Sequence, residues 1–399
     1  MPRHYRVGIV GFGIAGGALA IRLARAGHDV TIFERAPQVG PVGAGFLLQP
    51  SGQGVLRRMG LLDSIIPHSE PIDGLHAFKA NGQTLAHLRY PEALSGRCAY
   101  GVHRGLLFGT LHTAVRAENI PIGLDREIVI WRDIAEGVLA MDANGGEHGP
   151  FDFLVAADGS RSRLRQPLNP EVAAREYEFG ALWAVGCGTP IRGYLHQVTD
   201  GTRHLLGLLP MGGDQCTLFW GLWQHQVEPL RRRGFAAWRE AVVRLSPLAE
   251  AVLDDIGSFD RVVFSGYQHV QPRRIYNEHV VCIGDAAHSM SPHLGQGVNL
   301  ALLDAECLAE SLSVTADPLS AFRRYHRRRA SQTRYYATLS RLLTPFFQSE
   351  GWLLGFGRDL ALPLMTAIPP IRRQMELALA GVKTSLFGAI RNGDTDEHG

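Results

Sequence analysis

The stretch GDAAHSMSPHLGQGVN, residues 284–299, places an acid among small residues between two regular patterns. Residues 279–283 before it have the pattern of a short strand, with an apolar run from Val280 to Ile283, and the residues after Gly297 have the apolar periodicity of a helix. Asp285 should therefore lie at the carboxyl edge of a sheet, where α/β proteins bind ligands. The helix would direct free N–H groups and the positive end of its dipole toward the same place. We expect this stretch to stabilise an anion, or a group that becomes anionic.

The N-terminal residues predict a nucleotide-binding unit. Residues 5–34 have the pattern of a buried strand, an amphipathic helix and a second strand. Between the first strand and the helix stands Gly11-x-Gly13-x-x-Gly16, whose glycines permit a tight turn, a close approach of the backbone to a pyrophosphate, and close helix packing. Glu34 ends the second strand, where an acid accepts hydrogen bonds from a ribose. Together these features predict dinucleotide binding.

A third stretch follows the same logic. The apolar run FDFLVAAD, residues 151–158, ends in Asp158-Gly159, which on its own would fit a strand-ending turn equally well.

From about 176 to 224 the chain changes to alternating strands separated by turn signals at Asp200-Gly201 and Gly212-Gly213. This pattern predicts an antiparallel sheet inserted into the α/β domain.

The three stretches, in this order, resemble the fingerprints of class A FAD-dependent aromatic hydroxylases of the para-hydroxybenzoate hydroxylase fold. The resemblance implies an α/β fold with a Rossmann-like FAD-binding domain, an inserted antiparallel β-sheet substrate domain and C-terminal helices. We accordingly predict a discontinuous FAD-binding domain (1–75, 100–170 and 271–340), a substrate domain (76–99 and 171–270) and a C-terminal helical segment (341–399).

The resemblance also implies an activity and a set of cofactor residues. It implies a monooxygenase that uses FAD, NADH or NADPH, and O2 to hydroxylate an aromatic or other electron-rich small molecule through a flavin hydroperoxide. Residues 41–49 lack the arginines of the prototype family member, so NADH and NADPH stay equally open. The residues that the resemblance assigns to the cofactor are Gly11, Gly13, Ala15, Gly16, Glu34, Arg35, Gly45, Arg104, Asp158, Asp285, Pro292, Gly295, Gly297, Val298 and Asn299.

The inserted sheet is expected to cover the aromatic substrate. In TLFWGLW, strand parity puts Phe219 and Trp223 on one face and Trp220 on the other, but it does not say which face meets the substrate. Hydroxylation by a flavin needs no acid–base triad, so we name no catalytic residue from the sequence. The candidate substrate residues are Trp183, Phe219, Trp220, Trp223 and His293, and His196 and His288 are further histidines that could orient a phenol or serve only as structural groups.

Composition excludes several other functions. The formal net charge is +2, which gives no reason to expect a nucleic acid as partner. The five cysteines are scattered without a C-x-x-C pair, and no cluster has metal-ligand spacing, so we expect neither disulfides nor a metal site. The N-terminus has no signal-peptide pattern, and a cytoplasmic location is expected.

The C-terminal segment after residue 341 is unusually apolar. Its longest uncharged run, Leu360–Ile371, is shorter than the ~18 residues that a membrane span needs. Two interpretations stay open: helices that pack on the FAD domain or a dimer partner, and a surface for a membrane or a lipophilic substrate. The protein would be a monomer or a homodimer. The arginine-rich residues 322–334 are expected to form a solvated helix face.

Other flavoprotein classes fit the sequence less well. A flavin halogenase of the same fold would carry a W-x-W-x-I-P segment and a reactive lysine, and this chain has no W-x-W. A disulfide reductase would need a cysteine pair soon after the first unit, and none occurs between Glu34 and Arg97. A flavin-binding redox protein that does not hydroxylate is the alternative that stays open.

Overall fold

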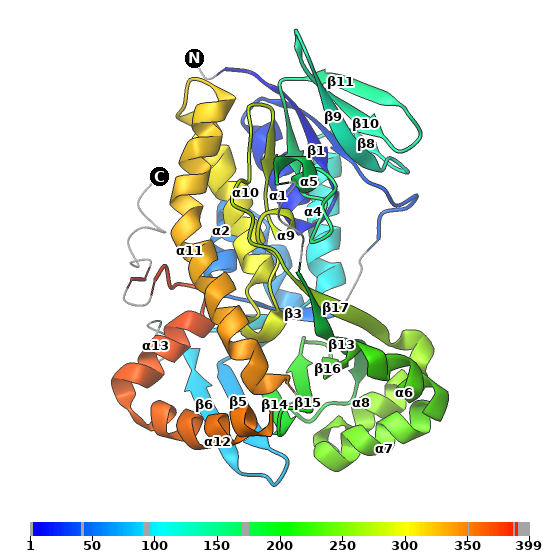
Figure 1. The fold of residues 1–399 in the computed structure, drawn as a ribbon, viewed down its shortest axis with the longest axis vertical. Helices are drawn as coiled ribbons and strands as arrows, with labels where there is room; N and C mark the ends of the chain where they lie inside the picture. The colour runs from blue at the N-terminus through cyan, green and yellow to red at the C-terminus, as the bar shows by residue number, and fades with distance from the viewer. Residues whose placement is uncertain are drawn as a thin grey trace.

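The fold was analysed in a computed structural model of the chain. The structure describes residues 3–40, 44–90, 94, 96–169, 175–349, 351–385 and 388–389. Within them, the arrangement has two large layers, an upper α/β region and a lower sheet with helices, which a long helix connects (Figure 1). The arginine-free stretch at 41–49 falls partly outside the described residues, because these omit 41–43.

A five-stranded parallel sheet forms the centre of the α/β region. Its strand order is β18-β12-β1-β2-β8, so segments far apart in the sequence become neighbours. All neighbouring pairs run parallel, and the inner strands are almost fully buried, as expected for apolar strands covered on both faces. The strands are β1 (Arg6–Val10), β2 (Asp29–Phe33), β8 (Ile122–Gly123), β12 (Phe153–Ala156) and β18 (Val280–Cys282).

Helices and two small sheets complete this region. Helix α1 packs against both α10 and α4, and α10 also packs against α2 and α11, in one continuous apolar core. The sheets are β3-β7-β4 and β11-β10-β9. The helices are α1 (Ile14–Arg25), α2 (Pro50–Arg58), α4 (Arg104–Ala117), α5 (Arg165–Leu168), α9 (Asp285–His288) and α10 (Gly297–Ser313); the strands are β3 (Gly45–Leu48), β4 (Glu70–Ile72), β7 (Ala99–His103), β9 (Ile128–Ile134), β10 (Gly137–Asp142) and β11 (Glu147–Phe151).

The second region is a seven-stranded sheet in the order β17-β13-β16-β15-β14-β5-β6. Five of the six neighbouring pairs are antiparallel, including those between the predicted strands, but β14 pairs parallel with β5, because the β5–β6 hairpin from earlier in the chain adds to this edge. The strands are β5 (Gly74–Lys79), β6 (Thr84–Arg89), β13 (Arg175–Cys187), β14 (Tyr194–Asp200), β15 (His204–Pro210), β16 (Gln215–Trp223) and β17 (Val263–His269).

The two faces of the seven-stranded sheet have different neighbours. One face packs with helices α6 (Val227–Arg233), α7 (Phe235–Leu245) and α8 (Glu250–Ile256) in a separate apolar core. The other face meets the α/β region, because the Gly45 N–H in β3 donates a hydrogen bond of 2.6 Å to the Thr217 hydroxyl in β16. Because side chains alternate along a strand, this contact identifies which residues of β16 face the α/β region.

The C-terminal helices join the two regions. Helix α11 (Pro318–Phe347) begins at an Asp317 side chain that accepts the Ser320 N–H at 2.9 Å, and it runs from the α/β region to the lower sheet (Figure 1). Helices α12 (Trp352–Ala367) and α13 (Pro369–Leu379) then cover the β5–β6 end. Short 3-10 turns link other elements: η1 (Leu62–Ser64), η2 (Ile66–His68), η3 (Gln224–Gln226), η4 (Pro247–Ala249), η5 (Phe259–Arg261) and η6 (Pro292–Leu294).

The predicted domain boundaries stay predictions. The boundary at 75/76 falls inside β5, which belongs entirely to the seven-stranded sheet, and the boundary at 170/171 lies outside the described residues. No helix in the described ranges is both long enough and apolar enough to cross a bilayer.

Candidate functional site

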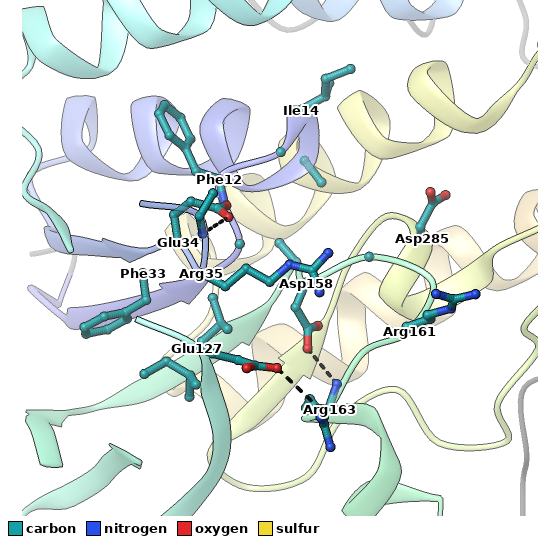
Figure 2. A pocket seen from close by; sticks show the side chains of 18 of the residues that line it. Phe12, Ile14, Phe33, Glu34, Arg35, Glu127, Asp158, Arg161, Arg163 and Asp285 are labelled. Carbon is teal, nitrogen blue, oxygen red and sulfur yellow. Dashed lines mark hydrogen bonds and ion pairs between the residues drawn. The ribbon is translucent and has the colours of Figure 1, made fainter. Parts of the chain in front are cut away.

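A cleft of about 1260 Å³ opens at the carboxyl edge of the five-stranded sheet. It brings together all three motifs, and Figure 2 shows Glu34, Asp158 and Asp285 around it. Such an edge is where open α/β sheets bind ligands. The predicted cofactor residues that line the cleft are Gly11, Gly13, Ala15, Glu34, Arg35, Arg104, Asp158, Asp285, Gly297 and Val298.

The three glycines of the first motif differ in the space around them. Gly11 has a φ of +104°, and a Cβ there would lie 2.4 Å from the carbonyl oxygen of Ala157. A Cβ on Gly16 would lie 2.1 Å from the carbonyl oxygen of Gly11. A Cβ on Gly13 would meet nothing within 4 Å, because this residue faces the cleft. Gly11 and Gly16 therefore allow the turn to fold, whereas Gly13 keeps space open for a ligand.

Glu34 is fixed at the end of β2 by backbone donors. Its Oε2 accepts the Phe12 N–H and its Oε1 accepts the Ala36 N–H, each at 2.9 Å. A carboxylate has about four lone-pair positions, so both oxygens can still accept hydrogen bonds from a diol. The glutamate thus both holds the glycine-rich turn in place and presents acceptors to the cleft.

Asp158 has one satisfied and one unsatisfied oxygen. Oδ2 accepts the Arg163 N–H at 2.8 Å, while the buried Oδ1 has no hydrogen-bond partner among the residues that the structure describes. Burial raises the pKa of this carboxyl above its usual value. An orphaned acceptor in a ligand-sized cleft fits a donor group of a bound molecule.

Arg165 links the second motif to the third. Its side chain is 5% exposed and donates to the carbonyl oxygens of Ser160 at 2.7 Å and Ala286 at 3.0 Å. The Asp158 loop and the Asp285 loop are therefore held in a fixed relation by one buried guanidinium. Arg165 lines the cleft, but its hydrogen bonds go to the backbone of the two loops that form the cleft walls.

The third motif presents an acid and an open helix end. Asp285 is exposed into the cleft, and Gly297 and Val298 line it at the start of α10. The residue before α10, Gln296, does not cap the helix, because its Nε2 donates to the carbonyl oxygens of Leu294 and Leu379. The first N–H groups of α10 are thus available to an acceptor in the cleft.

A buried network that the sequence did not reveal supports this motif. Asp304 is fully buried; its Oδ2 accepts the Gly284 N–H at 2.9 Å and contacts His288, and its Oδ1 accepts Arg329 Nε at 2.7 Å. Burial alone would raise the pKa of Asp304, but His288 and Arg329 outweigh it and lower the pKa to about 2. The prediction that residues 322–334 form only a solvated face is therefore wrong at Arg329, which is 7% exposed.

Several predicted cofactor residues support the cleft without lining it. Asn299 is fully buried, donates to the carbonyl oxygens of Leu47 and Gly295, and accepts the Gln49 N–H. Its side chain therefore joins α10 to the β3–α2 connection. Four other predicted cofactor residues also lie outside the cleft lining. Gly16 and Gly45 allow close packing, Pro292 begins η6, and Gly295 directly follows it.

The structure resolves which face of β16 looks toward the cofactor domain. Phe219 and Trp223 share parity with Thr217, which contacts Gly45, and Trp183 packs against Phe219 with ring centroids 5.3 Å apart. Trp220 points the opposite way and is 4% exposed in the core beneath α6–α8. We therefore assign Trp220 to the core rather than to a substrate pocket.

The three candidate histidines lie in different parts of the structure. His196, in β14, has its Nε2 3.4 Å from the Ser246 hydroxyl, beside α7, and His288 is held by Asp304. His293 lies in η6, just before α10, near the rings of Tyr267 and Phe347. Across the described ranges, no group of three or more His, Cys, Asp or Glu residues is placed to hold a metal.

Comparisons with known proteins agree with this site. Residues 4–335 match the family model described as FAD binding domain. The aurachin C monooxygenase/isomerase of Stigmatella aurantiaca is 32% identical over 79% of this chain and 83% of its own length. The kynurenine 3-monooxygenase of Salinispora arenicola is 31% identical over 85% of this chain and 79% of its own.

A solved structure extends the agreement to the fold. The 2-methyl-3-hydroxypyridine-5-carboxylic acid oxygenase superposes with a TM-score of 0.80 at 20% identity, over 96% of this chain and 97% of that chain. The three segments that converge on the cleft lie within the matched family range. The chain therefore belongs to the FAD-binding-domain family and is an FAD-dependent monooxygenase of the aromatic hydroxylase type.

Proposed function

We propose that FAD binds along the cleft and that each motif holds one part of it. The Gly13 backbone and the start of α1 would bind the pyrophosphate, Glu34 the adenosine ribose, and Arg104 the chain between them. Asp285 would accept hydrogen bonds from the ribityl hydroxyls, and the start of α10 would face the flavin ring. The observation that carries this proposal is the convergence of an open helix end and an orphaned buried acceptor, Asp158 Oδ1, on one cleft.

The residues of this chain position and stabilise rather than react. When bound, FAD supplies two-electron chemistry between NAD(P)H, O2 and the substrate. The N–H groups of Gly297 and Val298 and the dipole of α10 would favour negative charge on a flavin ring held in front of them. The aromatic face formed by Trp183, Phe219 and Trp223 would cover an aromatic substrate and keep water from it.

The test is substrate-stimulated turnover of the purified flavoprotein. NADH and NADPH are each supplied with O2 and a panel of phenols, quinolones, indoles and polyketide aromatics. We expect one or more aromatics to accelerate the consumption of the nicotinamide and to gain a hydroxyl group. FAD-loaded protein that shows no stimulation by any compound would support the non-hydroxylating redox protein instead.

We also infer that α12 docks on an anionic membrane surface. Leu353, Phe356, Leu360 and Leu364 share one outer face of the helix and are each more than 60% exposed. Such a row on a soluble protein marks an interaction site. No polar side chain interrupts it, which suits lipid better than a protein interface with its regular hydrogen bonds.

Charge on the segments that flank α12 in the sequence fits the same partner. Arg341 and Arg373 are exposed before and after α12, and the carboxylate of Asp359 is paired with Arg358. Exposed arginines on the segments next to a membrane-docking helix attract anionic headgroups.

Flotation with vesicles tests this docking. Vesicles of phosphatidylcholine with and without phosphatidylglycerol are mixed with the wild type, the double variant Phe356→Glu/Leu360→Glu, and the control Val314→Glu, which changes an equally exposed residue after α10. We expect the wild type and control to float with anionic vesicles and the double variant to stay behind. Wild type absent from the lipid fraction at low salt, or a dimer that the double variant abolishes, would overturn the membrane assignment.

A further inference from the structure

Two buried polar side chains near the predicted substrate face have unused hydrogen-bonding atoms. Gln348, directly after α11, is 2% exposed; its Nε2 donates to the Gly180 carbonyl at 3.3 Å, but its Oε1 has no partner within the described ranges. Neither ring nitrogen of His293 makes a well-aligned hydrogen bond there either, although the Gln348 side chain is close enough to influence the imidazole. Leaving such groups unpaired costs free energy, so a ligand or water is expected to meet them.

The Gln348 side chain lies on the face of the seven-stranded sheet that meets the α/β region. A Cβ on Gly221 would lie 2.5 Å from Gln348 Nε2, so the glutamine occupies the space that a side chain at 221 would fill. Gly221 stands between Phe219 and Trp223 on β16 and shares their face. Gln348 is therefore a polar interruption in an otherwise aromatic surface.

His293 reaches the same place from the cofactor side. It lies in η6, between the Asp285 loop and the start of α10. Its ring is 6.0 Å from that of Tyr267 in β17 and 5.9 Å from that of Phe347, the residue before Gln348. Burial lowers the pKa of His293 to about 4, and the nearby Gln348 side chain, which can accept a hydrogen bond from the protonated ring, only partly opposes the shift, so the imidazole is neutral near pH 7.

Among the residues that the structure describes, the charged and titratable neighbours of His293 supply no free cation. Burial raises the pKa of the Tyr267 hydroxyl, which stays neutral. The Arg358 guanidinium lies 5.4 Å from the centre of the Phe347 ring, but it is bonded to Asp359 and to the carbonyl oxygens of Gly201 and Phe346. A carboxylate placed beside His293 would thus gain no counter-charge, and an isolated buried charge is costly.

We propose that His293 and Gln348 form the polar end of the substrate site and select a neutral aromatic ring with a hydroxyl or ring N–H donor over an aromatic carboxylate. A neutral imidazole offers one acceptor and one donor, and the glutamine oxygen offers a second acceptor. This inference rests on the proposed binding of an aromatic substrate under the Trp183–Phe219 face.

The test measures binding to the oxidised, FAD-loaded enzyme without NAD(P)H, from the change in flavin absorbance. The probes are 1-naphthol, its methyl ether 1-methoxynaphthalene, and 1-naphthoate. The variants are His293→Leu, Gln348→Leu and the conservative His293→Gln. The control is His196→Gln, because His196 lies beside α7 on the opposite face of the sheet.

We expect the wild type to bind naphthol more tightly than the ether, and naphthoate most weakly. Loss of one hydrogen bond should weaken naphthol binding about fivefold in each leucine variant, with little effect on the ether. His293→Gln should retain most of the preference, and His196→Gln should retain all of it.

Three outcomes would overturn the assignment: tightest binding of naphthoate by the wild type, equal losses for naphthol and its ether in the leucine variants, or no response to any probe. Its failure can be told from failure of the proposed function. An enzyme that holds FAD and hydroxylates another aromatic while failing these binding tests keeps the function and loses the polar pair. Protein that binds no FAD loses both.

Discussion

The FAD cleft and the aromatic face of the seven-stranded sheet recognise their ligands in different ways. The cleft relies on backbone: tight glycine turns, two open helix ends and acids fixed at strand ends. The aromatic face relies on side chains that strand parity selects and on one residue from the end of α11. The difference teaches that short sequence motifs can specify a cofactor site, whereas a substrate site depends on how elements far apart in the sequence pack together.

The largest expected effect is in the network behind the cleft. Asp304→Ala leaves Arg329 and His288 without their buried partner, and we expect a loss of about 3–5 kcal/mol in the free energy of unfolding, measured with urea. Asp254→Ala is the control, since Asp254 pairs with Arg239 at the surface, where such pairs contribute little. Equal stability of the two variants would show that the buried network does not hold the cleft.

The two faces of β16 give the next contrast. Trp220→Ala opens a cavity in the core under α6–α8 and should lower the free energy of unfolding by about 3–5 kcal/mol. Phe219→Ala, on the other face, should cost less stability but weaken the binding of aromatic compounds. Thermal unfolding and flavin absorbance titrations separate the two effects. If Phe219→Ala lost more stability and Trp220→Ala lost more affinity for aromatic compounds, the two faces of β16 would be assigned the wrong way round.

Asp285 tests the cofactor side directly. Asp285→Ala removes the carboxylate that would accept hydrogen bonds from FAD, and we expect FAD binding to weaken by roughly 1.5–3 kcal/mol, or about 10- to 150-fold in Kd. Asp285→Asn keeps one acceptor and should lose less. The flavin content of the purified variants reports the result, and an undiminished yellow colour in the alanine variant would contradict the role.

The smallest expected effect is on the pH dependence of stability. His293 has its pKa lowered to about 4 in the folded chain, against an ordinary value of 6.5, so the unfolded chain takes up the proton first. Its contribution is present above pH 6.5 and is lost as the pH falls toward 4. His293→Gln should therefore lose less stability over this window. His76, whose pKa is also lowered to about 4, keeps its share in both proteins, so a difference between them reports on position 293.

The cleft could be predicted from sequence because its residues stand in short motifs with fixed neighbours. Gly11 and Glu34 directly follow the two strands of one strand–helix–strand unit, and Asp158 and Asp285 each follow an apolar run, so their place at one sheet edge follows from the pattern. The parallel pairing of β5 with β14 could not be predicted in this way, because it depends on a hairpin far away in the sequence.

The supporting residues were hidden for the same physical reason. Arg329 stands in an arginine-rich helix that looks solvated, and only the packing of α11 on α10 buries it against Asp304. Gln348 follows α11 in a segment with no motif, and its role depends on the absence of a side chain at Gly221. The face on which Trp220 lies could be assigned only once the Gly45–Thr217 contact was known.

Titration of the apoprotein with FAD tests the central claim most directly, that three separated segments form one cofactor cleft. We predict saturation at one FAD per chain, with a perturbed flavin spectrum. Folded protein that stays colourless and shows no affinity for added FAD would contradict the account.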